Sequence, residues 1–224
     1  MKPIPIVYYS DVLCVWAYFA QLRVEAIQRT YGDRVRFEYR YCSVFGDTAR
    51  KVAAVWATKG GYEGFNAHIL HAASGFPELK VNPGIWLTVR PASSMAPHLF
   101  LKAIQLGATE GAWGIDALET AMKQMRAAFF EDARDISDRD VHLELAERAS
   151  VDMAVVETFM ADGRAHAALS SDYKDADAAG VQGSPTFILN EGRQKLFGNV
   201  GYRIIEANIE ELLRRPSADQ ASWC

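Results

Sequence analysis

The sequence predicts an α/β fold in which two halves of one sheet flank a helical region. Near the N-terminus, an apolar run over residues 4–9, an amphipathic stretch over 15–31 and an alternating run over 35–41 give the order strand, helix, strand. Near the C-terminus, short strands at 186–189 and 194–197 precede an amphipathic helix. Because the middle of the chain is helical, we expect one four-stranded sheet with a helical domain inserted between its βαβ and ββα halves.

The N-terminal unit is the better defined half. In residues 15–31 the spacing puts Phe19 and Leu22 on one stripe, and Gly32 follows as a helix-ending residue. In residues 35–41 apolar and polar side chains alternate, which is typical of a half-buried strand. A strand, a helix and a strand in so short a segment predict a right-handed unit with parallel strands.

The middle of the chain carries the start and stop patterns of several helices. Residues 49–57 and 62–73 have helical spacing, whereas the proline and glycine content of residues 76–84 predicts a loop. A helix that begins near Ser94 is expected to end at Gly107. Residues that can cap the helices of this region are Ser93 or Ser94, Asp116, the segment 137–140 and Asp152.

The organisation into domains follows from this order of elements. A helix from about 164 to 179 and a last helix around 202–212 belong with the C-terminal strands. We therefore expect residues 1–45 and 164–215 to form the sheet domain and residues 46–163 to form the inserted helical domain. Residues 216–224 are expected to be a loose tail.

Composition narrows the possible functions. The chain has 224 residues, a formal net charge of -4 and no basic patch, which argues against nucleic acid as a partner. No run of 18 apolar residues predicts a membrane span, and no signal peptide is visible, so we expect a cytoplasmic protein. Three cysteines are too few for a disulfide framework, and this count suits a reducing compartment. No pattern of metal ligands is recognised, so no metal site is expected.

Cys14 is the candidate catalytic residue, because it lies at the predicted strand-to-helix turn. Backbone N–H groups at a helix N-terminus have no partner inside the helix, and the helix dipole is positive there. Such a position favours the thiolate, which is the nucleophilic form of cysteine. Asp11 acts in the opposite direction, because a carboxylate close to Cys14 disfavours the thiolate. The alternative is that Cys14 is a buried cysteine that acts as a small hydrophobic residue.

Two motifs give the chain a resemblance to a known family. Ser10-Asp-Val-Leu-Cys14-Val-Trp-Ala17-Tyr18 resembles the pattern S-D-x-x-C-P-W-C-Y, and Gly180-Val-Gln-Gly-Ser184-Pro185-Thr-Phe187 resembles G-V-x-G-[TVS]-P-T-F. Both patterns are typical of the DsbA-like branch of the thioredoxin superfamily. That branch also includes kappa-class glutathione transferases and 2-hydroxychromene-2-carboxylate isomerases. The resemblance implies a thioredoxin-like fold with an inserted helical domain.

The resemblance also assigns roles to residues outside the cysteine. In this family a cis-proline lies against the reactive thiol, and the residue before it offers its backbone to an extended peptide or to glutathione. Ser184 and Pro185 are therefore expected to bind substrate or glutathione, and Trp16 is expected to line the same groove. Without the first motif, Ser184 and Pro185 would be interpreted as an ordinary turn.

The chain departs from the family pattern at two positions. Ala17 replaces the second cysteine and Val15 replaces the proline. A dithiol site releases a mixed disulfide when its second thiol attacks, and Ala17 cannot do so. A mixed disulfide on Cys14 must therefore be resolved by glutathione or by another thiol. Cys42 is a candidate resolving thiol, since it follows the neighbouring parallel strand, and Cys224 is a weaker one.

These observations favour a monothiol thiol-disulfide oxidoreductase, with Cys14 as nucleophile and glutathione as co-substrate rather than a bound cofactor. One alternative is a glutathione-dependent transferase or isomerase, because relatives with that chemistry carry serine at the position of Cys14. Another is a non-catalytic module that binds peptides or senses oxidants through Cys14. Glutathione or a thiol or disulfide substrate is the expected partner, and related glutathione-using proteins make a homodimer a further expectation.

Overall fold

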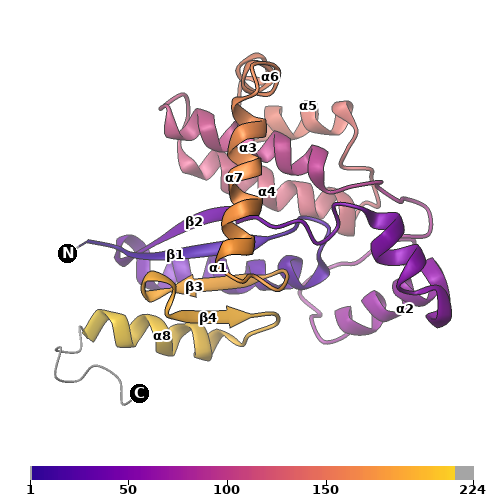
Figure 1. Cartoon of the computed structure of the whole chain (residues 1–224), viewed down its shortest axis with the longest axis horizontal. Helices are drawn as coiled ribbons and strands as arrows, with labels where there is room; N and C mark the ends of the chain where they lie inside the picture. The colour runs from indigo at the N-terminus through magenta and orange to yellow at the C-terminus, as the bar shows by residue number, and fades with distance from the viewer. Residues whose placement is uncertain (1, 215–224) are drawn as a thin grey trace.

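A computed structural model describes residues 2–214, and its centre is a four-stranded sheet (Figure 1). The strands are β1 (Ile4–Ser10), β2 (Val35–Tyr41), β3 (Thr186–Leu189) and β4 (Gln194–Phe197), in the order β2-β1-β3-β4. β1 and β2 are parallel, and β3 is antiparallel to both of its neighbours. Ser10 pairs with Tyr41, so β1 and β2 end at the same edge of the sheet.

Eight α-helices surround the sheet within the described residues. They are α1 (Val15–Tyr31), α2 (Gly61–Ala73), α3 (Met95–Thr109), α4 (Ile115–Phe130), α5 (Arg139–Arg148), α6 (Met153–Ala161), α7 (Arg164–Ala178) and α8 (Tyr202–Arg214). In Figure 1, α7 crosses in front of the sheet, α1 lies behind it, and α3 to α6 gather above it. None of the helices in residues 2–214 combines the length and the apolar character that crossing a bilayer requires.

The two faces of the sheet bury different sets of side chains. On the face covered by α1, Tyr8 and Tyr39 pack edge to face, with ring centroids 6.2 Å apart. On the face covered by α7, Cys42 and Ile188 pack against Ala176 in a separate apolar cluster. Strand alternation therefore places Cys42 on the face of the sheet opposite α1.

The segment between α2 and α3 covers the N-terminal half of α1. Phe76 stacks on Phe19 with ring centroids 4.2 Å apart, and the Tyr18 hydroxyl donates to the carbonyl of Lys80 and to the carboxylate of Glu131. Trp86 is fully buried with a φ of 63°. Aromatic contacts thus attach the inserted region to the helix that Cys14 begins.

The predicted elements agree with the structure over the sheet, and the differences lie in the middle of the chain. Residues 49–57 do not form one α-helix, because a π-helical turn over Ala49–Ala54 is followed by a 3₁₀ turn over Ala57–Lys59. Gly107 does not end α3, which continues to Thr109. Gly107 is instead a contact site, since a Cβ there would lie 2.1 Å from the ring of Trp113.

Candidate active site

Cys14 occupies the N-cap of α1, where β1 gives way to the helix. Its φ and ψ of -85° and 117° are extended, and its carbonyl accepts from Ala17 N–H and Tyr18 N–H at 3.0 and 3.1 Å. Asp11 shapes the preceding turn, because its Oδ1 accepts the Leu13 N–H at 3.0 Å and its carbonyl accepts the Cys14 N–H at 3.1 Å. The sulfur-bearing residue is therefore held at the first turn of the helix.

The two sequence motifs meet at this turn. The peptide bond between Ser184 and Pro185 is cis, and the Cys14 thiol donates to the Ser184 carbonyl at a sulfur–oxygen distance of 3.2 Å. The Asp11 N–H donates to Ser184 Oγ at 2.8 Å. Two direct contacts thus join segments that lie about 170 residues apart in the chain.

The Asp11 carboxylate organises the backbone around Cys14. It is fully buried, and its Oδ2 accepts the N–H groups of Val44 and Phe45 and the hydroxyl of Ser94 at 3.0, 2.8 and 2.8 Å. Burial raises the pKa of Asp11 to about 6, although these donors and the Leu13 N–H pull it down. The carboxylate therefore ties the turn before Cys14 to the exit of β2 and to the start of α3.

His98 completes this arrangement from α3. Its Nε2 accepts the Val12 N–H at 3.1 Å and lies 3.7 Å from Asp11 Oδ1, and its Nδ1 lies 3.0 Å from the Tyr173 hydroxyl. Because Nε2 is an acceptor, we assign the proton of the neutral ring to Nδ1. Burial lowers the pKa of His98 to about 3, and the charges of Arg126 and Lys102 act in the same direction. His98 is thus neutral, and it holds the turn before Cys14 through the hydrogen bond from the Val12 N–H.

The electrostatics at Cys14 differ from the expectation of a favoured thiolate. Cys14 is only 6% exposed, and burial raises the pKa of its thiol above the ordinary value. The Ala17 N–H and the contact with Ser184 lower that pKa, whereas the charge of Asp11 raises it further. Desolvation of the sulfur therefore outweighs the helix N-terminus, and the thiol is the resting form.

Three further positions of the first motif lie in the first turn of α1. Trp16 is half-buried and packs edge-on against Phe19, with ring centroids 5.7 Å apart. Val15 is buried, and Ala17 is fully buried one helical turn after Cys14. The position that carries the second cysteine in the family pattern thus contributes a backbone N–H to the site but no sulfur.

Cys42 lies in a different environment from Cys14. Its N–H donates to the Ser10 carbonyl at 3.2 Å, while its side chain packs in the cluster against α7. It lines a cavity of about 490 Å³ together with Tyr173 and with Gly183 of the cis-proline loop. Burial raises the pKa of its thiol, and the charges of Asp11 and Cys14 add to the effect. Both thiols are free, and the resolving role of Cys42 stays a prediction.

Two contributors to the site were not identifiable from the sequence. Ser94 and His98 lie more than 80 residues after Asp11, and no local pattern linked them to Cys14. Asp11 itself was visible through its nearness to Cys14, but its role as a hydrogen-bond acceptor for three segments was not.

Cys224 lies outside the described residues. Over residues 2–214, no three or more His, Cys, Asp and Glu side chains are grouped to hold a metal ion.

Comparison with known proteins places this geometry in a family. The pattern of the DSBA-like thioredoxin domain family matches residues 5–210. The ClpXP adapter protein SpxH of Halalkalibacterium halodurans is 23% identical over 222 residues, which cover 95% of this chain and 68% of that protein.

Two solved structures share the fold. One is a 2-hydroxychromene-2-carboxylate isomerase, with a TM-score of 0.65 and 18% identity over 98% of this chain and 100% of that one. The other is the cytosolic disulfide reductase DsbM of Pseudomonas aeruginosa with GSH, with a TM-score of 0.66 and 21% identity over 94% of this chain and 100% of that one. With the family match spanning nearly its whole length, the chain belongs to the DsbA-like thioredoxin domain family.

Proposed function

We propose that the protein is a monothiol thiol-disulfide oxidoreductase in which Cys14 is the nucleophile and glutathione completes the cycle. The observation that carries the proposal is the contact between the Cys14 sulfur and the Ser184 carbonyl beside cis-Pro185. The buried Ala17 supplies no second sulfur at the helix turn. The cis-proline loop therefore lies beside one thiol, and the motif offers no second one. This arrangement is consistent with thiol-disulfide exchange through a single cysteine.

The cycle requires two exchange steps. The Cys14 thiolate attacks one sulfur of a substrate disulfide, a new S–S bond forms on Cys14, and the other sulfur leaves as a thiolate that takes up a proton. A glutathione thiolate then attacks the mixed disulfide and forms a new disulfide with the bound sulfur, and Cys14 is released reduced. When the substrate is a glutathionyl mixed disulfide and Cys14 takes its glutathionyl sulfur, the products are the substrate thiol and oxidised glutathione, so the substrate is reduced and glutathione is oxidised.

The surroundings of Cys14 support a role for the cis-proline loop in this chemistry. The Ser184 carbonyl accepts from the Cys14 thiol, Pro185 follows Ser184 across the cis bond, and Trp16 lies two residues after Cys14. We assign these three residues to the proposed binding surface for the substrate or for glutathione. The DsbM structure with GSH, which has the same fold, supports glutathione as the co-substrate. A cytoplasmic location and a homodimer belong to this proposal, and light scattering of the purified protein tests the second.

A pair of cysteine variants tests the proposal. With glutathione and a small glutathionyl mixed disulfide as substrates, Cys14→Ser should lose turnover. Cys42→Ser, a matched removal of the other buried thiol, should keep turnover within a few-fold if glutathione resolves the intermediate. Mass spectrometry of the wild-type protein treated with oxidised glutathione should find one glutathionyl group on Cys14. Unchanged turnover in Cys14→Ser would contradict the proposal.

A second candidate function is a glutathione-dependent isomerase or transferase. This candidate is favoured by the raised pKa of the Cys14 thiol. Because burial keeps the thiol protonated, Cys14 is a neutral S–H donor, as a serine hydroxyl would be at the same position. The isomerase of the same fold adds support for this chemistry. In that case Cys14→Ser should still bind glutathione and keep much of its activity on an electrophilic substrate, while disulfide turnover is absent in both proteins.

A further inference from the structure

Each backbone N–H group of residues 11–14, the turn that ends at the reactive thiol, has an acceptor. Three of these acceptors are oxygen atoms of Asp11 and Ser184. The remaining acceptor is a ring nitrogen, because the Val12 N–H donates to His98 Nε2 at 3.1 Å. An imidazole nitrogen accepts a hydrogen bond only when it carries no proton, so this contact exists in only one tautomer of the neutral ring.

The His98 ring is held on its face as well as at its edges. It is fully buried and stacks on Tyr41, with ring centroids 4.7 Å apart and an angle of 21° between the ring planes. Its Nδ1 lies 3.0 Å from the Tyr173 hydroxyl of α7. Because Nε2 accepts from Val12, the single ring proton is on Nδ1, and the ring donates it to the Tyr173 oxygen. The tyrosine hydroxyl is therefore the acceptor that matches this tautomer.

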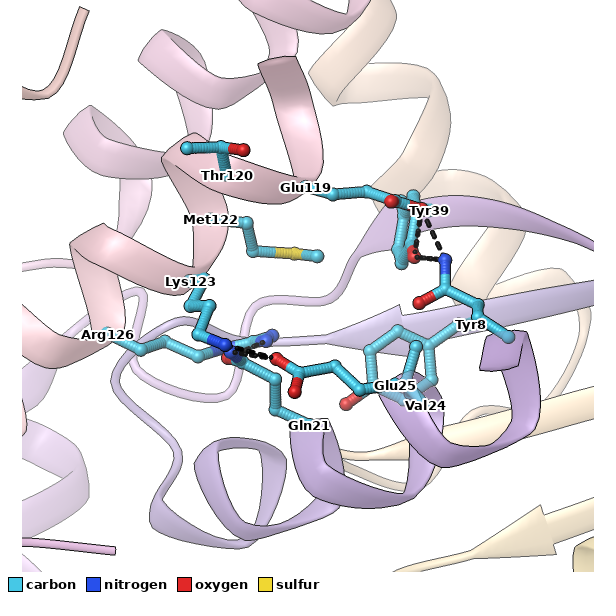
Figure 2. A pocket seen from close by; sticks show the side chains of 11 residues that line it. Tyr8, Gln21, Val24, Glu25, Tyr39, Glu119, Thr120, Met122, Lys123 and Arg126 are labelled. Carbon is cyan, nitrogen blue, oxygen red and sulfur yellow. Dashed lines mark hydrogen bonds and ion pairs between the residues drawn. The ribbon is translucent and has the colours of Figure 1, made fainter. Parts of the chain in front are cut away.

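Two buried cations help to keep the ring from taking up a second proton. Figure 2 shows one of them, Arg126, which extends from α4 toward Gln21 of α1 and is 1% exposed. Burial lowers the pKa of His98 to about 3, and the charges of Arg126 and Lys102 act in the same direction. The ring is therefore neutral at pH 7, so its tautomer rather than its charge determines whether it can accept from Val12.

The other tautomer of His98 also has an acceptor within reach. Asp11 Oδ1 lies 3.7 Å from Nε2, which is too long for a hydrogen bond in the present arrangement. With its proton on Nε2, the ring would donate toward this carboxylate, and the Val12 N–H would lose its acceptor. The carboxylate and the backbone N–H thus compete for the same ring nitrogen, and the hydrogen bond at Nδ1 decides between them.

We infer that Tyr173 is a positioning residue that acts on the Cys14 turn through His98. Its hydroxyl holds the ring proton on Nδ1 and leaves Nε2 free to accept the Val12 N–H. α7 leads into the cis-proline loop, whose Ser184 Oγ accepts the preceding N–H of the same turn. One stretch of chain thus supports two adjacent N–H groups, one directly and one through the histidine. The expected effect on reactivity rests on the proposed role of Cys14 as nucleophile, whereas the tautomer of His98 does not.

Nitrogen-15 NMR of the histidine rings at pH 7 tests the inference directly. The wild-type protein should show His98 protonated at Nδ1 and unprotonated at Nε2. Tyr173→Phe keeps the aromatic ring and removes only the hydroxyl, so a form of His98 protonated at Nε2 should appear. Exchange of the Val12 N–H with deuterium should then become about tenfold faster, because this group loses its acceptor. Tyr202→Phe removes a hydroxyl that is bonded to Thr30 instead, and it should change neither signal.

The rate at which Cys14 forms a mixed disulfide with oxidised glutathione measures the effect on reactivity. Tyr173→Phe should lower this second-order rate constant about fivefold, as expected for one lost hydrogen bond in the turn that orients the sulfur. His98→Leu removes both ring nitrogens. Adding Tyr173→Phe to His98→Leu should lower the rate constant no further, because the tyrosine acts only through the ring.

Three results would overturn the inference. They are a wild-type His98 protonated at Nε2, an unchanged ring and rate constant in Tyr173→Phe, and a further loss of rate in the double variant. The wild-type spectrum keeps the test decisive if a variant does not fold. If the wild-type protein forms no mixed disulfide at all, the proposed function fails, whereas the NMR measurements still decide whether Tyr173 sets the tautomer of His98.

Discussion

Asp11 illustrates how one buried side chain can hold a reactive turn and also weaken its reactivity. Its carboxylate accepts backbone N–H groups from the Cys14 turn and from the exit of β2, which fixes the backbone on both sides of the sulfur. The same negative charge raises the pKa of the Cys14 thiol. Structural support and activation of the nucleophile therefore oppose each other at this residue.

Replacing Asp11 by asparagine should separate these two effects. Asp11→Asn keeps an oxygen for the Leu13 N–H but removes the charge, so the pKa of the Cys14 thiol should fall. The pH dependence of Cys14 alkylation by iodoacetamide, followed by mass spectrometry, measures this change. Asp140→Asn, an exposed site on α5, is the matched control and should leave the profile unchanged. A higher pKa of Cys14 in Asp11→Asn would contradict this interpretation.

His98 should make the protein sensitive to acid. Because burial lowers its pKa to about 3, the unfolded chain takes up a proton near pH 6.5 while the folded chain does not. The contribution of neutral His98 to the free energy of unfolding is fully present above pH 6.5 and is lost as the pH falls toward 3. At pH 4 the loss is about 3 kcal/mol by the linkage relation.

The comparison with His98→Gln isolates this contribution. Asp11, whose raised pKa acts in the opposite direction over part of this range, is present in both proteins. Urea unfolding at pH 7 and pH 4 should therefore show a larger loss of stability in the wild type than in His98→Gln. His166→Gln, an exposed histidine on α7, should behave as the wild type. Equal losses in the wild type and in His98→Gln would mean that His98 is not buried in its neutral form.

At the scale of elements, the first turn of α1 determines how a mixed disulfide can be released. Ala17 lies one turn after Cys14, and its N–H points back to the Cys14 carbonyl at 3.0 Å. Ala17→Cys restores a second thiol at this position, so a glutathionyl group on Cys14 should be lost without added thiol. Its lifetime by mass spectrometry should shorten at least tenfold, since the second thiol attacks within the same molecule.

Ala20→Cys gives the matched control for this experiment. Ala20 is also buried on α1, one turn further from Cys14. Its thiol should leave the mixed disulfide as long-lived as in the wild type. An equally long lifetime in Ala17→Cys would show that a sulfur at position 17 does not reach Cys14.

Elements with a strong apolar periodicity were predicted correctly from the sequence. The errors concern where helices of the inserted region begin and end. α1 and all four strands lie within a residue of their expected bounds, because each pairs a clear apolar pattern with a turn residue. Asp116 was expected to cap α4, but Gly114 is the N-cap, so Asp116 lies within the first turn. Gly107 was expected to end a helix, whereas Trp113 packs against it. The error at Gly107 arises from this packing contact, which spacing in the sequence does not show, whereas the error at Asp116 is a two-residue shift of the helix start.

For the whole molecule, a buried polar cluster joins the inserted helices to the sheet. Lys102 of α3 lies 2.5 Å from Asp172 of α7, and Asp172 Oδ2 also accepts the Tyr41 N–H at 3.0 Å. Arg40 of β2 lies 3.7 Å from the other oxygen of Asp172. The two motifs predicted that the ends of the chain meet at Cys14. No pattern linked Lys102 to Asp172, because their contact depends on how α3 and α7 pack.

This cluster should make folding of the insertion and of the sheet one cooperative event. Lys102→Met leaves the buried Asp172 carboxylate without its nearest cation, which should cost about 3 kcal/mol of unfolding free energy. The double variant Lys102→Met/Asp172→Leu removes both charges, so it should be less destabilised than the sum of the two single variants. Arg139→Ala, which breaks an exposed ion pair with Glu157, should cost less than about 1 kcal/mol. Additive losses in the double variant, or two separate unfolding transitions in the wild type, would show that the insertion and the sheet are stabilised independently.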